Sequence, residues 1–187
     1  MVKQLDLSQA VTALSDGGVI AYPTEAVWGL GCDPRQQAAV AKLLRLKQRP
    51  VEKGVIVVTA SLDLLDDWLD LDALPATRIA EIQASWPGPN TWVLPTTPKA
   101  PSWVTGSHDS LAVRISAHPL VAALCQQWQA PLVSTSANLA GMPPARSRDQ
   151  LDPALLRELD GIVDGETGQQ AQPTTIRDAR SGQVLRL

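Results

Sequence analysis

Residues 34–58 read PRQQAAVAKLLRLKQRPVEKGVIVV, and they hold the two patterns that decide the fold. In the first part, apolar residues recur at helical spacing, which predicts an amphipathic helix over residues 34–48. Arg49-Pro50 ends this helix, because the residue before a proline avoids the helical region of backbone space. The apolar run 55–58 then predicts a buried strand. A helix that leads directly into a buried strand is typical of an α/β sheet.

The same succession of strands and helices continues on both sides of this segment. It predicts helices over residues 8–14, 62–69, 75–86, 119–128 and 153–159, strands over 19–22, 91–94, 111–116 and 132–133, and a closing hairpin of residues 174–177 and 183–187. Ser8 is available to cap the first helix, and the segment 29–31 (GLG) is expected to be flexible. Strands that alternate with helices imply an α/β fold with a mixed, partly parallel sheet flanked by helices. We expect the whole chain, 1–187, to form a single domain.

The composition is that of a globular protein, and it limits the kinds of ligand site. Apolar residues make up 44% of the 187 residues and charged residues 19%, with a formal net charge of -3. A nucleotide or nucleic-acid site must therefore come from a local basic cluster. Cys32 and Cys125 lie far apart in apolar contexts, which indicates buried thiols and a reducing compartment. Since neither a signal peptide nor a membrane-spanning run is seen, we expect a cytoplasmic protein with no membrane contact.

Familiar catalytic and nucleotide motifs are absent from the sequence. The segment 29–31 has no third glycine at the dinucleotide spacing, and no glycine-rich segment ends in Gly-Lys-Ser/Thr. No Cys/His pattern indicates a metal site. With only His108 and His118 available, a hydrolase that uses Ser134 or Ser136 lacks a plausible histidine partner and ranks last.

The first candidate site is a cluster of cations directly after the 34–48 helix. Lys47, Arg49 and Lys53 fall within seven residues, and only Glu52 opposes them. Ligand sites of α/β folds gather at such loops, and a proline-stiffened turn lowers the entropy of presenting several donors to a polyphosphate. Ordinary capping of the helix C-terminus by cations explains the same residues equally well.

The second candidate site is the polar run that ends an apolar strand. Residues 134–138 (STSAN) bring several short polar side chains together, and these can bind phosphate, ribose or carboxylate oxygens. A hydroxyl-rich turn that caps its own backbone is the alternative. The third candidate is Arg114, which would clamp a carboxylate or phosphate if it faced a cleft. From strand alternation alone, a solvated arginine on an edge strand is the better explanation of Arg114.

Together these segments resemble a known family, the YrdC-like threonylcarbamoyl-AMP synthases, and in particular its short bacterial form, often called TsaC. The resemblance covers nearly the whole chain. It rests on five motifs in the family's order, namely residues 22–31 (YPTEAVWGLG), 46–50 (LKQRP) with 53–54 (KG), 86–89 (WPGP), 111–114 (LAVR) and 134–138 (STSAN). Five ordered motifs are far more specific than any one of them. The resemblance implies a twisted α/β sheet with a concave basic surface.

The resemblance also implies roles for individual residues. It implies that Lys47 and Arg49 are catalytic and face the ATP phosphates, and that ATP contacts Arg49, Lys53, Ser110, Ser136, Asn138, Pro144 and Arg186. It implies an L-threonine site made of Thr24, Ala26, Arg114, Ser134 and Thr174. Many members have threonine where this chain has Ala26, so one hydroxyl contact to the substrate is in doubt. The loop at residues 142–144 is a candidate cover for the site.

The implied reaction joins L-threonine, bicarbonate and ATP into threonylcarbamoyl-AMP and diphosphate, for the threonylcarbamoyladenosine (t6A) modification of tRNA at position 37. Such transfer depends on positioning and charge neutralisation, which suits clustered cations without a catalytic triad. No metal ligands are visible, and Mg²⁺ is expected to arrive with ATP. Expected partners are the tRNA-modifying proteins that use the adenylate. The rival hypothesis is a module that binds tRNA or double-stranded RNA without catalysis of its own.

Overall fold

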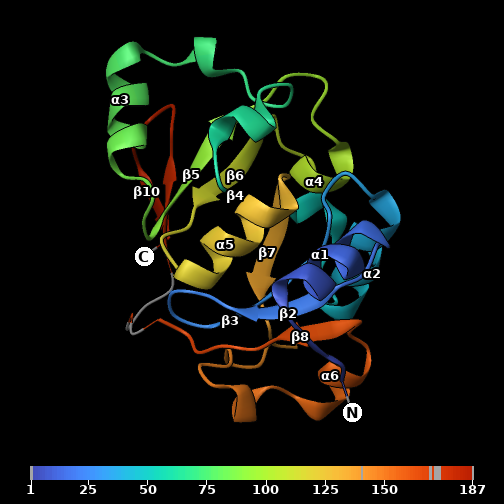
Figure 1. Ribbon diagram of the computed structural model, residues 1–187. Coiled ribbons are helices and arrows are strands. Elements are labelled where there is room, and N and C mark those ends of the chain that lie inside the picture. The colour runs from blue at the N-terminus through green and yellow to red at the C-terminus, as the bar shows by residue number, and fades with distance from the viewer. Residues whose placement is uncertain (1, 140, 169, 171–173, 187) are drawn as a thin grey trace.

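A mixed β-sheet runs through the molecule, as the computed structural model shows for residues 2–139, 141–168, 170 and 174–186 (Figure 1). Within these described residues the sheet has ten strands in the order β1-β8-β2-β3-β7-β4-β6-β5-β9-β10. The strands are β1 (Gln4–Leu5), β2 (Ile20–Pro23), β3 (Trp28–Gly31), β4 (Ile56–Thr59), β5 (Asn90–Pro95), β6 (Ser110–Ile115), β7 (Leu132–Ser136), β8 (Gly161–Val163), β9 (Thr175–Asp178) and β10 (Val184–Arg186). The sheet contains both parallel pairs (β1–β8, β2–β8, β4–β6, β5–β9) and antiparallel ones, which confirms the mixed single-domain α/β fold.

Helices cover both faces of the sheet, and the apolar residues of the strands divide between them. The helices are α1 (Leu7–Ser15), α2 (Gln37–Leu46), α3 (Ala76–Ala84), α4 (Ser102–Thr105), α5 (Pro119–Trp128) and α6 (Pro153–Arg157). Val58 packs into the cluster that contains α1 and α5, whereas its neighbour Val57 packs into the cluster that contains α2. This alternation is the period of two expected of a strand buried on both faces. No helix in the described part of the chain is long and apolar enough to cross a membrane.

The central prediction from the sequence, a helix followed by a buried strand, is confirmed in α2 and β4. Short 3₁₀ turns appear at Val51–Lys53 between the two elements and at Leu62–Leu65, where a helix over 62–69 was predicted. The closing hairpin is confirmed as β9 and β10, which pair in antiparallel fashion, while its predicted last residue, Leu187, lies outside the described residues. The strands β1 and β8 were not predicted.

Two local predictions from the sequence are wrong. The cap of α1 is Asp6 and not Ser8, because Asp6 accepts from the backbone of Gln9 while the Gln9 side chain accepts from the backbone of Asp6. The segment 29–31 belongs to a buried central strand and is not a flexible linker. A Cβ on Gly31 would lie 2.6 Å from the carbonyl oxygen of Val133, so the glycine permits close strand packing there.

The connection from β8 to β9 crosses the molecule from one side of the sheet to the other. The strand β8 lies beside β2, whereas β9 lies beside β5, near the opposite edge. On the way the chain passes over the turn between β2 and β3, where the backbone of Gly168 donates to the carbonyl of Thr24 at 2.9 Å. This crossing brings the start of β9 to the same cavity as the β2–β3 turn.

Candidate active site

One pocket of about 650 Å³ opens on the sheet face that α1 and α5 leave uncovered. Its base, called here the sheet floor, is a row of register partners on five adjacent strands: Ser134 (β7), Ile56 (β4), Ala112 (β6), Val93 (β5) and Asp178 (β9). Because side chains alternate along a strand, the residues on either side of this row point into the core on the opposite face. The strands therefore give the pocket a rigid base that combines small and apolar side chains with polar ones at its two ends.

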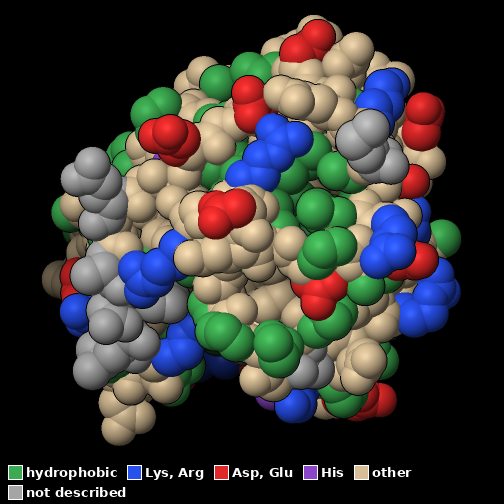
Figure 2. Space-filling model, turned by 90° about the horizontal axis from the view of Figure 1, so that it is seen from below, with side chains coloured by type: hydrophobic (Ala, Val, Ile, Leu, Met, Phe, Trp, Pro, Cys, Tyr) green, Lys and Arg blue, Asp and Glu red, His purple; other side chains and the backbone are tan. Residues whose placement is uncertain are grey.

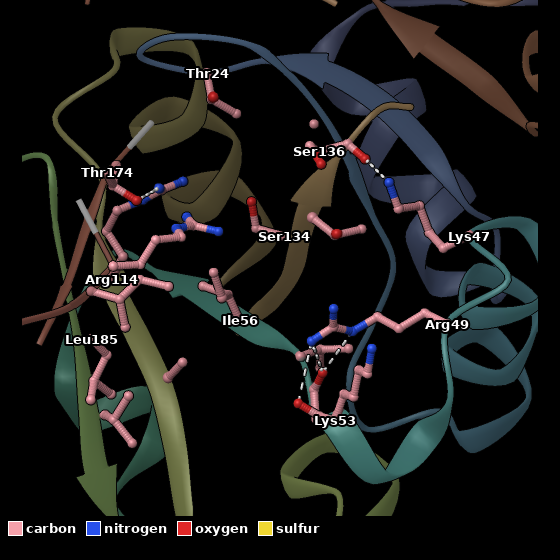
Figure 3. Close-up of a pocket in the computed structure, with 18 of the residues that line it drawn as sticks. Thr24, Lys47, Arg49, Lys53, Ile56, Arg114, Ser134, Ser136, Thr174 and Leu185 are labelled. Atoms are coloured by element: carbon pink, nitrogen blue, oxygen red, sulfur yellow. Dashed lines mark hydrogen bonds between the residues drawn. The ribbon is translucent and has the colours of Figure 1, made fainter. Parts of the chain in front are cut away.

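A wall of the pocket is formed by the residues that follow α2, called here the cation loop (residues 47–53). Figure 3 shows Arg49 and Lys53 on one side of the cavity and Arg114 and Thr174 on the other. The guanidinium of Arg49 donates from Nε and Nη2 to the carbonyl of Gly54, at 3.1 and 3.0 Å, which fixes the turn. Neither Arg49 nor Lys53 forms an ion pair within the described residues. The loop therefore supplies positive charge that is not taken up in an ion pair with any described carboxylate.

Lys47 belongs to the same loop but is buried, and its ammonium is fully engaged by the protein (Figure 3). Its Nζ donates to the carbonyls of Ser136 and Asn138, at 2.6 and 2.5 Å, and to Oδ1 of Asn138 at 2.9 Å. Burial, and secondly the charge of Arg49, lowers the pKa of Lys47 to about 8. Lys47 lines the pocket as the family resemblance implied, but in this structure it ties the end of α2 to the end of β7.

Arg114 lies on β6 in the interior of the sheet, so the explanation as a solvated edge-strand arginine is wrong. Its Nη1 donates to Oγ1 of Thr174 at 2.9 Å, and its Nη2 lies 3.7 Å from Oε2 of Glu25. A guanidinium fixed in this way on a rigid strand is suited to a planar carboxylate. Glu25 received no role from the sequence, because its partner Arg114 is distant along the chain and no local pattern links the two.

The structure brings together every candidate residue implied by the resemblance except one. The pocket is lined by Thr24, Ala26, Lys47, Arg49, Lys53, Ser110, Arg114, Ser134, Ser136, Pro144, Thr174 and Arg186. Asn138 is not a lining residue: its Oδ1 accepts from Lys47 and its Nδ2 donates to the carbonyl of Met142 at 2.6 Å. The turn-capping explanation of residues 134–138 therefore describes Asn138, whereas Ser134 and Ser136 face the cavity.

The charges that line the pocket are strongly unbalanced. Among the described residues, five cations line it, Lys47, Arg49, Lys53, Arg114 and Arg186, against the two carboxylates Glu25 and Asp178. Desolvation, followed by the charges of Arg114 and Arg49, lowers the pKa of Arg186. Cations from three separate elements thus converge on one volume, as a polyanionic ligand requires.

Within the described residues the pocket shows no hydrogen bond between a serine and a histidine side chain and no cluster of metal-ligating side chains. Nε2 of His118 lies 3.1 Å from the backbone oxygen of Glu166, and neither Ser134 nor Ser136 has a hydrogen bond to a histidine within the described chain. No group of three or more His, Cys, Asp or Glu that could hold a metal ion is found among the described residues. The two lining carboxylates sit apart, one beside Arg114 and the other at the end of the sheet floor.

Comparison with known proteins gives concordant matches. A family model with the name Sua5_yciO_yrdC and the description "Telomere recombination" matches residues 12–187. A protein of Xanthomonas euvesicatoria pv. vesicatoria (strain 85-10) called threonylcarbamoyl-AMP synthase is 72% identical over 186 residues, which cover 100% of both chains. A variant of Sua5 from P. abyssi has a TM-score of 0.88 at 26% identity, and the match covers 100% of this chain and 59% of the Sua5 chain. P. abyssi Sua5 complexed with L-threonine has a TM-score of 0.84 at 28% identity, with 94% of this chain and 53% of that chain covered.

Proposed function

The chain belongs to the Sua5/YciO/YrdC family, and we propose that it is a threonylcarbamoyl-AMP synthase. It forms threonylcarbamoyl-AMP and diphosphate from L-threonine, bicarbonate or CO₂, and ATP, and so supplies the t6A modification of tRNA. One observation of the structure carries this proposal. A single pocket joins the uncompensated cations of the cation loop to a buried arginine, Arg114, on the sheet floor side. Such a pocket suits a triphosphate next to an amino-acid carboxylate.

The chemistry needs positioning more than an activated nucleophile. The threonine amine and bicarbonate give an N-carboxy group and water, and an oxygen of this group then attacks the α-phosphorus of ATP while the bond to diphosphate breaks. Arg114, with Ser134 and Thr174 nearby, holds the threonine carboxylate, whereas Arg49, Lys53 and Arg186 bind the phosphates and the charge that develops on the leaving diphosphate. Lys47 ties the cation loop to the end of β7 through its bonds to Ser136 and Asn138.

Mg²⁺ enters this proposal with ATP. The pocket has only two lining carboxylates among its described residues, and Glu25 is already paired with Arg114, so triphosphate oxygens and water are the better ligands for the ion. Bound in this way, it would neutralise phosphate charge. We also propose that the enzyme works in the cytoplasm, with tRNA-modifying proteins that accept the adenylate.

The rival hypothesis, an RNA-binding module without catalysis, predicts a continuous basic surface. On the face shown in Figure 2, Lys and Arg side chains are interspersed with Asp and Glu and form no such continuous patch. The deep pocket is also the wrong shape for a duplex, because double-stranded RNA is recognised across its broad minor groove. The enzymatic function is therefore the one we propose, and RNA binding does not replace it.

The test is incubation with ATP, Mg²⁺, L-threonine and bicarbonate, followed by mass analysis for the adenylate. We expect adenylate and diphosphate in equal amounts, both dependent on threonine and bicarbonate and independent of RNA. Diphosphate release that is unchanged when threonine is omitted would refute the assignment. RNA binding without ATP consumption, whether or not threonine and bicarbonate are present, would favour the RNA-binding hypothesis.

A further inference from the structure

Glu25 is a buried carboxylate that the proposed reaction leaves without a role. It lies on the turn between β2 and β3, is 5% exposed, and lines the pocket beside Arg114, which is 6% exposed. Oε2 of Glu25 is 3.7 Å from Nη2 of Arg114, the one ion pair that either residue forms among the described residues. Because burying an unpaired charge is costly, the opposite charges of these two side chains offset each other.

The carboxylate of Glu25 is held in place from behind by the end of β6. Oγ of Ser116 donates to Oε1 of Glu25 at 2.7 Å, and the same Oγ accepts from the backbone of His118 at 3.1 Å. Ser116 and Arg114 are two residues apart and therefore project from the same face. Glu25 and Arg114 are thus positioned by one short segment of backbone, and their separation is set by the fold and not by a flexible side chain.

Glu25 and Arg114 lie close together, but each keeps one polar side-chain atom without a hydrogen-bond partner among the described residues. Oε2 of Glu25 and Nε of Arg114 are both buried, and neither has a hydrogen-bond partner in the part of the chain that the structure describes. Buried polar atoms without partners are rare, and they call for a ligand, a water or a functional reason. Arg114 therefore keeps donors for a ligand while its charge is already balanced.

The other end of the pocket has the opposite character. Arg49 and Lys53 of the cation loop have no ion pair with a carboxylate among the described residues. A strongly anionic triphosphate gains from this uncompensated charge, whereas a zwitterionic amino acid, which is neutral overall, is suited to a compensated arginine.

We propose that Glu25 is a positioning residue that assigns the two substrates to the two ends of the pocket. It fixes the guanidinium of Arg114 for the carboxylate of a zwitterionic amino acid, and by balancing the charge of Arg114 it keeps free phosphate and diphosphate out of the amino-acid end. This inference rests on the proposed function, because it takes threonine and ATP as the two ligands.

The test compares Glu25→Gln, which keeps the shape and the hydrogen bond from Ser116 but removes the charge, with Glu52→Gln. Glu52 is an exposed acid of the cation loop that does not line the pocket, so its variant controls for the loss of one negative charge nearby. Adenylate formation is measured by mass analysis while threonine, ATP and added inorganic phosphate are varied. For Glu25→Gln we expect the threonine KM to rise about tenfold, the size of one charge-assisted contact, with an unchanged ATP KM. We further expect phosphate to compete with threonine in this variant but only with ATP in the wild type and in Glu52→Gln.

Glu25→Gln with a wild-type threonine KM and no competition between phosphate and threonine would overturn the inference, as would a loss of thermal stability without any change in these constants. If the variant does not fold, by circular dichroism, Ser116→Ala takes its place. That variant keeps the charge but frees the carboxylate, so we expect a smaller rise in threonine KM without phosphate competition, and a wild-type threonine KM would overturn the inference. A wild-type enzyme that forms no threonine-dependent adenylate would instead refute the proposed function.

Discussion

The cation loop and the sheet floor face each other across one pocket, but they present charge in different ways. On the loop, Arg49 and Lys53 are exposed and no carboxylate pairs with them among the described residues. Beside the sheet floor, two residues beyond Ala112 on the interior strand β6, Arg114 is buried between Glu25 and Thr174. A loop can adjust its donors to several phosphate oxygens, whereas a strand holds a single donor group in a single orientation. We therefore expect ligand binding to depend mainly on positive charge at the loop, and mainly on the orientation of the donor groups at the strand.

The largest effect is expected on the cation loop. Arg49→Ala removes a preorganised donor from the charge that develops on the leaving diphosphate, which typically lowers the rate by about 10²–10³. Arg45→Ala is the matched control, because Arg45 is an exposed residue of α2 that does not line the pocket. Turnover is measured at saturating and limiting ATP, with circular dichroism as the check on folding. Equal losses at the two positions would mean that the loop supplies only diffuse charge and that Arg49 is not a positioned donor.

The second prediction tests whether the planar donor group of Arg114, beside the sheet floor, is needed. Arg114→Lys keeps the charge but removes the planar fork, so we expect the threonine KM to rise about 10–100-fold, the value of a charge-assisted contact of about 1.5–3 kcal/mol. The ATP KM should change little. The measurement is the full dependence of adenylate formation on both substrates. Wild-type affinity for threonine in this variant would show that charge alone suffices at position 114, as on the cation loop.

The third effect concerns Lys47, which joins the cation loop to the end of β7. Below its pKa of about 8 its three N–H groups match three acceptors, and above that pH one donor and the charge are lost. We therefore expect turnover to fall by up to about tenfold as the pH rises through this value. Since the pKa in the folded protein is below the ordinary value of 10.5, the unfolded chain binds more protons between these values, and stability from this group rises with pH over the same range.

Turnover is expected to fall with rising pH while the stability contributed by Lys47 rises, so the two effects can be told apart. A thermal unfolding series recorded beside the pH–rate profile separates loss of activity from loss of fold. In Lys47→Arg the charge persists to high pH, so the alkaline fall near pH 8 should disappear even if the maximal rate is lower. An identical alkaline limb in this variant would assign the titration to another group.

The smallest effect separates two residues of the same motif. Ser136→Ala removes a neutral hydroxyl that faces the cavity, and we expect the ATP KM to rise about 2–10-fold, or about 0.5–1.5 kcal/mol. Asn138→Ala instead removes the acceptor of Lys47 and the donor to Met142, so it should mainly lower the melting temperature. Calorimetry with ATP and thermal scans on both variants distinguish the two outcomes. The reverse pattern would show that Asn138 reaches the nucleotide after all.

The parts of the fold that follow from local sequence were predictable. The α2–β4 unit was read from helical spacing followed by an apolar run, and the β9–β10 hairpin from two short strand patterns. The strand β3 was missed because its two glycines indicate flexibility in isolation. Only the approach of β7, with the carbonyl of Val133 in the way of a Cβ on Gly31, explains why glycine is needed in a buried strand.

The candidate site was predictable in its members but not in their partners. The cations and hydroxyls were found through short motifs and a family resemblance. The engagement of Lys47 depends on acceptors 89 and 91 residues away, and the placement of Glu25 depends on Ser116, also 91 residues away. No periodicity or spacing encodes such contacts, which arise only when the sheet assembles.

The crossing from β8 to β9 bears on when, during its synthesis, the protein becomes able to bind its ligands. The hydroxyls of Thr91 and Thr174 meet at 3.2 Å although the residues are 83 positions apart, because β9 returns to a strand made much earlier. Contacts between such distant segments form late, since loop closure opposes them until the partner strand is available. Thr174 and Arg186 both line the pocket and both emerge from the ribosome after every strand from β1 to β8. A nascent chain that has not yet folded β9 and β10 therefore has an unfinished pocket, and its ligand site is completed by the last strands to be made.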